Sequence, residues 1–85
     1  MFPIYRKSKD LKNYYKILNE REFIQLKIIG TKIRKYHYNV DKYPEIIMIK
    51  DMIDCENEFY VISQEIEFNN KELLIQSFNL KENKK

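Results

Sequence analysis

Two side chains in this chain of 85 residues could combine a nucleophile with a base, because Cys55 is its only cysteine and His37 its only histidine. A catalytic thiol needs a base within hydrogen-bond reach, and no local signature of that kind surrounds either residue. A structural zinc site needs four ligands, usually cysteine and histidine, which this chain does not supply. We therefore expect Cys55 to be a small buried or boundary hydrophobe and His37 a solvent-facing strand residue.

An acidic stretch over residues 54–58 offers alternating oxygen atoms, and Glu65 stands at the spacing from Asp54 that joins the first and last positions of a calcium loop. The sixth position of such a loop needs glycine for its sharp turn, and here it is Phe59. The only glycine, Gly30, cannot build a phosphate-binding loop by itself. We expect no catalytic residues, no metal and no cofactor, so the chain is not expected to be an enzyme.

Cations and aromatic rings alternate with apolar residues between positions 13 and 40. If Ile24, Leu26 and Ile28 point into the core, lysines and rings are expected on the opposite side of a sheet. This predicted binding face comprises Tyr14, Lys16, Phe23, Lys27, Lys35 and His37. Lysines neutralise phosphates and exposed rings stack on bases, so the face suits a single-stranded nucleic acid. The same pattern is also typical of the polar side of any half-exposed sheet.

Tyrosine is suited to protein interfaces, since its ring buries a large area while its hydroxyl finds a hydrogen-bond partner. Tyr5, Tyr43 and Tyr60 lie near the ends of predicted elements and are the candidate protein-interface aromatics. The leading hypothesis is a small non-catalytic protein of phage or mobile-element type that binds another protein, as an inhibitor, adaptor or accessory subunit. Single-stranded nucleic-acid binding is the alternative, and an exposed edge strand could pair two copies as a homodimer.

The elements that position these residues begin with a predicted three-stranded antiparallel meander, because β-branched and aromatic residues dominate residues 13–40. The expected strands are 13–18, 23–29 and 32–40. Glycine at the first central position of the Gly30-Thr31 connection predicts a type II′ turn. In the third strand we expect Tyr36, Tyr38 and Val40 to point inward.

A helix is predicted over residues 44–54, since proline at position 44 favours a first helical turn and Ile46, Ile49 and Ile53 form one stripe with Met52 beside it. The stripe is expected to pack on the meander.

A short strand over 59–62 is expected to follow, and Ser63 resembles the N-cap of a closing helix that runs through Leu73, Leu74 and Phe78. The predicted fold class is a small single α+β domain. In the alternative, mostly β, fold, residues 59–80 form a hairpin whose first strand is 59–68 and whose turn is at Asn69-Asn70.

Length and composition favour one domain over residues 1–85, with an ordered core at about 12–80 and a polar tail at 81–85. A single cysteine allows no intrachain disulfide, and no secretory segment is visible, which together predict a cytoplasmic protein. The longest apolar run, 46–49, is far shorter than a membrane-spanning helix, so no membrane partner is expected.

Charge differs in sign between the two halves of the chain. Residues 1–50 carry 12 Lys and Arg against 5 Asp and Glu, whereas residues 51–85 carry 4 against 8. The bias of an AT-rich genome explains an abundance of lysine, but it does not explain why the lysines are concentrated in one half. We therefore expect a folded molecule with one basic and one acidic side.

Overall fold

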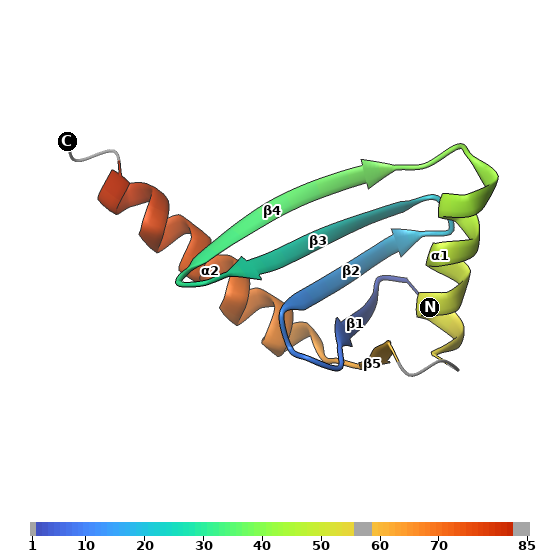
Figure 1. The fold of residues 1–85 in the computed structure, drawn as a ribbon, viewed down its shortest axis with the longest axis horizontal. Helices are drawn as coiled ribbons and strands as arrows, with labels where there is room; N and C mark the ends of the chain where they lie inside the picture. Colours follow the sequence, from blue (N-terminus) through green and yellow to red (C-terminus); the bar gives the residue numbers. More distant parts are fainter. Residues whose placement is uncertain (1, 56–58, 83–85) are drawn as a thin grey trace.

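The computed structural model describes residues 2–55 and 59–82, with side chains as far as residue 75. Its centre is an antiparallel sheet of five strands flanked by two helices, which confirms the α+β class (Figure 1). In chain order the elements are β1 (Ile4–Ser8), β2 (Asn13–Asn19), β3 (Glu22–Ile29), β4 (Lys32–Asn39), α1 (Tyr43–Asp54), β5 (Tyr60–Ile62) and α2 (Glu65–Glu82). The order of strands across the sheet is β4-β3-β2-β1-β5.

The predicted meander is present as β2, β3 and β4, and its β3–β4 turn has the expected geometry. Ile29 pairs with Lys32, so Gly30 and Thr31 form a two-residue connection. Gly30 has a φ of +61°, whereas Thr31 is not among the residues with positive φ. A positive φ at the first central residue alone is the signature of the type II′ turn.

Strand β1 was not predicted and lies outside the range 12–80 that was expected for the ordered core. It pairs with β2 on one side and β5 on the other. The segment is polar for a central strand, but both of its cations have partners on the helices. Arg6 donates to the carbonyl oxygens of Met52 and Ile53 in α1, and Lys7 forms an ion pair with Glu67 in α2. Charged residues are tolerated inside this sheet because they are paired there.

Helix α1 confirms the predicted helix and covers one face of the sheet, at the end away from the β3–β4 turn (Figure 1). Ile49 and Met52 are fully buried against Tyr15, Ile17 and Phe23, with Ile46 and Ile53 partly buried at the edge of this cluster. The stripe read from the sequence is therefore the packing face of the helix. We name this side of the sheet the α1 face.

Helix α2 covers the opposite side, the α2 face, and crosses it obliquely until it passes the β3–β4 turn (Figure 1). Phe68 is fully buried there against Tyr14 and Leu26. The alternative hairpin over 59–80 is wrong, because residues 65–82 are helical.

Ser63 is not the residue whose carbonyl begins α2, since the N–H groups of Glu67 and Phe68 donate to the carbonyl of Gln64. Instead the Ser63 hydroxyl donates to the Glu67 carboxylate at 3.1 Å. Leu73 and Leu74 are exposed, and the side chain of Phe78 lies outside the described residues.

None of the helices, within the part of the chain that the structure describes, is both long enough and apolar enough to cross a bilayer.

Candidate functional site

The six residues of the predicted binding face do not share one side of the sheet. Directly opposite residues of an antiparallel pair point to the same face. Lys16 and His37 both lie opposite Ile24, and Lys35 lies opposite Leu26. These cations therefore lie on the α2 face together with the apolar residues that they were expected to oppose. Tyr14, opposite Leu26, is on the α2 face as well, whereas Phe23 and Lys27 are on the α1 face.

Most residues of the predicted face are already held by other parts of the molecule. Lys35 forms an ion pair with Glu72 at 2.7 Å, and the His37 ring lies 2.6 Å from the Glu22 carboxylate. Tyr14 is buried, with the Lys71 ammonium 5.6 Å from its ring centroid. Phe23 is buried too, so it cannot stack on a ligand. Of the six, Lys27 is the cation exposed on the side of the sheet that α2 leaves uncovered.

Around Lys27 the structure forms a surface that the sequence analysis did not identify. We name it the open face, meaning the part of the α1 face on β3 and β4 that α1 leaves exposed or half-exposed. Lys27 lies directly opposite Arg34, Gln25 opposite Tyr36, and Ile29 opposite Lys32. The open face consists of Gln25, Lys27, Ile29, Lys32, Arg34, Tyr36 and Tyr38.

Lys27 and Arg34 form the most distinctive part of the open face, because two cations face each other on neighbouring strands. Like charges in directly opposite positions destabilise a sheet. Among the described residues, no carboxylate forms an ion pair with either of them, although Lys7 and Lys35 on the α2 face both have one. The open face therefore presents two positive charges that the fold does not neutralise by direct contact.

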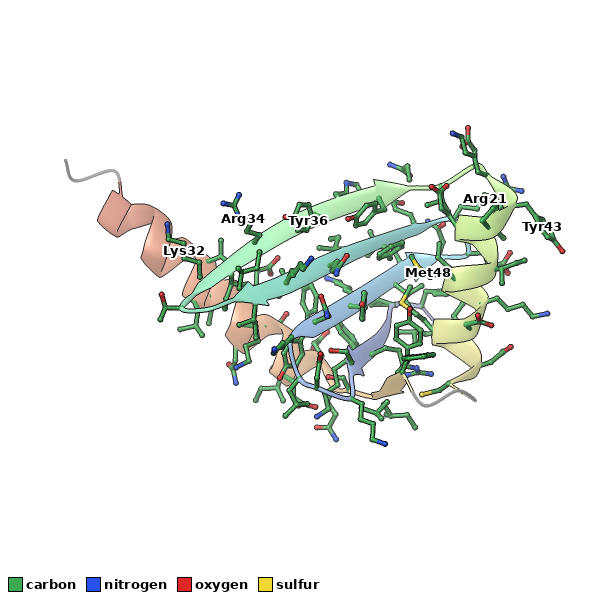
Figure 2. All side chains as sticks on the ribbon, viewed as in Figure 1. Arg21, Lys32, Arg34, Tyr36, Tyr43 and Met48 are labelled. Carbon is green, nitrogen blue, oxygen red and sulfur yellow. The ribbon has the colours of Figure 1, made fainter. Side chains whose placement is uncertain are left out.

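Two tyrosine rings lie beside this cation pair. Tyr38 stacks on the buried Phe23 ring, with 4.8 Å between centroids and 22° between planes, and the Tyr36 ring centroid is 6.2 Å from that of Tyr38. The prediction that Tyr36 and Tyr38 point into the core is wrong, since they remain 37% and 38% exposed. Only Val40 of that set is buried, because β4 is the sheet edge and α1 does not extend over it. Figure 2 shows Arg34 and Tyr36 on this outermost strand.

The three candidate protein-interface aromatics have different environments. The Tyr5 ring packs on Phe68, and its hydroxyl donates to Glu65 at 3.1 Å; burial, with this hydrogen bond second, raises the pKa of the phenol. Tyr60 is half-buried and meets Tyr15 edge-on at 5.6 Å. Tyr43 is 74% exposed and projects from the start of α1 (Figure 2). Of the three, Tyr43 alone presents its whole ring to a partner.

A simple sequence signal locates the cation pair. Once Gly30-Thr31 is read as a two-residue turn, Ile29 must lie opposite Lys32, and counting back along both strands places Lys27 opposite Arg34. Alternation within each strand does not by itself predict this pairing. The positions in the two strands must be counted from the turn that joins them.

Cys55 and His37, the potential nucleophile and base, are not placed together for chemistry. The Cys55 thiol donates to the carbonyl of Tyr60 at 3.1 Å, and His37 contacts Glu22. No cluster of three or more His, Cys, Asp or Glu residues is positioned to hold a metal within residues 2–55 and 59–82. Residues 56–58 of the acidic stretch lie outside the described residues.

Comparison with models of protein families, with curated proteins and with solved structures finds no match to this chain.

Proposed function

We propose that this protein is a non-catalytic binding protein whose open face binds single-stranded nucleic acid. The observation that carries the proposal is the pair formed by Lys27 and Arg34, opposite each other without a carboxylate partner in the described structure and next to the exposed rings of Tyr36 and Tyr38.

The geometry of the pair suits a phosphate. Side chains in directly opposite positions have Cβ atoms about 4.5–5.5 Å apart, so a single phosphate can contact both cations. Binding would then remove the repulsion between them and release counterions from the strand.

The rings supply the second part of the interaction. Base stacking on an exposed aromatic side chain contributes about 1–3 kcal/mol and tolerates any sequence. Tyr38 is held in place by its stacking on Phe23, so little of its conformational freedom would be lost on binding.

Protection of the sheet edge is a competing explanation for the cations of β4, because charged side chains prevent edge strands from pairing with other chains. The two explanations differ in one respect, since edge protection predicts no affinity for nucleic acid.

The test is fluorescence anisotropy of labelled single-stranded DNA and RNA, measured over a series of salt concentrations. The double variant Lys27→Gln with Arg34→Gln is expected to bind more weakly and to reduce the magnitude of the log–log salt slope by about 0.7, the value for one phosphate that the protein no longer neutralises. The matched control is Arg21→Gln with Lys42→Gln, which removes the same charge at the other end of the sheet, where Figure 2 shows Arg21. Equal losses in both double variants, or no binding by the wild type, would reject the open face as the site.

Protein binding is the second candidate, and a different surface favours it. Ile66 and Leu73 on α2 are 64% and 61% exposed. Ile66 and Leu73 lie two turns apart on the same side of the helix. An exposed apolar surface of this kind is typical of interaction sites.

This candidate is tested by affinity purification from native cells with wild type, with Ile66→Ser plus Leu73→Ser, and with Lys27→Gln plus Arg34→Gln. A protein partner that binds through α2 is expected to be lost from the first double variant and retained by the second. Retention by both double variants would reject this surface.

A further inference from the structure

A hollow of about 470 Å³ lies at the end of the open face, where the β1–β2 turn meets β5. It is lined by Ser8, Lys9, Asp10, Asn13, Tyr15, Phe59 and Tyr60. Its volume is in the range of sites that hold small ligands, about 300–1,000 Å³.

One residue that lines the hollow, Asn13, is a cross-strand neighbour of the cation pair. Asn13 lies directly opposite Lys27, and Lys27 opposite Arg34, so the three side chains form one row across β2, β3 and β4. The row continues towards β5 through Ser8, which pairs with Tyr60 and whose hydroxyl oxygen accepts a hydrogen bond from the Asn13 N–H at 3.0 Å. A strand whose phosphate lies between Lys27 and Arg34 can therefore direct its next base into the hollow.

The hollow is lined by one cation, Lys9, and by one carboxylate, Asp10, which hydrogen bonds hold in place. Oδ1 of Asp10 accepts hydrogen bonds from the Ser8 hydroxyl at 2.6 Å and the Lys12 N–H at 3.0 Å. These bonds, the Ser8 bond first, lower the pKa of the Asp10 carboxyl below its usual value, so the group is ionised at neutral pH. An ionised carboxylate repels a phosphate and accepts hydrogen bonds from N–H groups. The hollow is thus suited to the edge of a base that offers donors.

An amide supplies the complementary donors. Oδ1 of Asn13 accepts from Nε2 of Gln25 at 2.7 Å, which fixes the orientation of the Asn13 side chain and leaves the N–H groups of Nδ2 as donors. The Phe59 ring is 72% exposed beside them and offers a surface for stacking.

We propose that this hollow binds one guanine base of a single strand held by Lys27 and Arg34, an inference that rests on the proposed function. Guanine presents two kinds of N–H donor on one edge, at N1 and at the exocyclic N2, next to the O6 acceptor. The free Oδ2 of Asp10 can accept from the donors, while the Asn13 amide donates to O6. Adenine carries its amino group where guanine has O6 and lacks the N1 proton, so it offers the carboxylate one kind of N–H donor where guanine offers two.

The experiment compares labelled single-stranded DNA of one length in which a central tract of thymine is replaced by guanine, inosine or adenine. Binding is measured by anisotropy with wild type, Asp10→Asn and Phe59→Ala. The wild type is expected to prefer guanine over adenine by about 5- to 150-fold, with inosine, which lacks the N2 amino group, between them. The readout is this ratio of affinities, which a general loss of binding or a change in net charge does not alter.

Asp10→Asn is expected to bring the ratio close to one, and Asp41→Asn, the same change at an exposed position after β4, to preserve it. Phe59→Ala is the second variant, for the case that Asp10→Asn disturbs the β1–β2 turn. Phe59→Ala should lower the affinity for the guanine strand more than the affinity for the thymine strand. A wild type that binds all four strands equally, or a guanine preference that both variants retain, would overturn the hollow as a base site and leave the proposed function standing. A wild type that binds no strand would overturn both.

Discussion

Arg6 links the centre of the sheet to the end of α1. Its Nε donates to the carbonyl of Met52 at 2.8 Å and its Nη2 to the carbonyl of Ile53 at 3.0 Å. Carbonyl groups in the last turn of a helix have no partner within the helix and carry the negative end of its dipole. Helix α1, which the structure describes in full, has no basic residue in its own last turn. Arg6 supplies that charge from β1.

Replacing Arg6 by alanine is therefore expected to destabilise the fold by about 1.5–3 kcal/mol, the usual range for a hydrogen bond to a charged group. Urea denaturation followed by circular dichroism measures the change. Arg21→Ala serves as the control, because Arg21 is exposed in the β2–β3 turn, and it should change the free energy of unfolding by less than about 0.5 kcal/mol. Equal urea midpoints of unfolding for Arg6→Ala and Arg21→Ala would show that Arg6 does not stabilise α1.

The ionisation of Tyr15 is coupled to folding because its phenol is buried. Burial, followed by the nearby Tyr60, raises the pKa of its phenol to about 12. A raised pKa in the folded state means that the stabilisation is fully present below the unfolded pKa, about 10, and is lost as the pH rises towards 12. Between pH 10 and 12 the wild type should therefore lose more stability than Tyr15→Phe, which has no proton to release. Urea denaturation of both proteins at several pH values in this range measures the difference, and parallel losses would contradict the coupling.

At the scale of elements, Phe68 is the one fully buried side chain of α2 within residues 65–75. Phe68 is 1% exposed and packs between Tyr5, Tyr14 and Leu26, with ion pairs of Lys7 and Lys35 on either side. Exposed or half-exposed ion pairs contribute little, about 0–1 kcal/mol each, so the buried ring should dominate the docking of the helix.

Phe68→Ala is accordingly expected to cost about 3–5 kcal/mol and to increase hydrogen exchange throughout α2. Ile66→Ala on the same helix is the matched control, because Ile66 is largely exposed and its truncation should change stability by less than about 0.5 kcal/mol. If both variants lost similar stability, helix propensity rather than docking would explain the effect.

The parts of the fold that could be predicted are those that a short stretch of sequence specifies without distant partners. The Gly30 turn and the helix with Pro44 in its first turn were predicted correctly, because a backbone requirement at one position specifies each of them. Strand β1 was missed because Arg6 and Lys7 are acceptable there only through partners far along the chain, Met52, Ile53 and Glu67.

The binding face was assigned wrongly for a related reason. A half-exposed sheet has one apolar side, and the alternation of Ile24, Leu26 and Ile28 was interpreted on that basis. In this fold a helix lies on each side, so Phe23 and Leu26 are both fully buried although they face in opposite directions. The alternation of apolar residues within one strand does not show on which of the two apolar sides of the sheet a given residue of a neighbouring strand lies.

At the scale of the whole molecule, the opposite charges of the two halves do not simply become a basic side and an acidic side. Glu67 and Glu72 of the acidic half contact Lys7 and Lys35 of the basic half across the α2 face. Lys7, ahead of Ser63, is the main cause of a Glu67 pKa below its usual value. Folding thus brings part of the positive charge of the first half into contact with the negative charge of the second half. Lys27 and Arg34 on the open face have no such partner among the described residues.

This distribution makes stability and binding separable in a single substitution. Lys27→Glu places a carboxylate directly opposite Arg34, so it should convert a repulsive cross-strand pair into an attractive one and stabilise the fold by about 0.2–1 kcal/mol. The same variant should lose affinity for single-stranded nucleic acid, because a negative charge then stands where a phosphate is expected to bind. Urea denaturation and anisotropy on the same preparation measure the two quantities.

Arg21→Glu provides the control, because it makes the same change in net charge, from +3 to +1, away from the open face. It should leave stability within about 0.5 kcal/mol of the wild type and weaken binding less than Lys27→Glu does. A Lys27→Glu protein that is more stable and binds as well as the wild type would mean that the cation pair protects the edge of the sheet and has no part in binding. Higher stability together with lost binding would mean that the fold retains an unfavourable pair of charges because the ligand needs both.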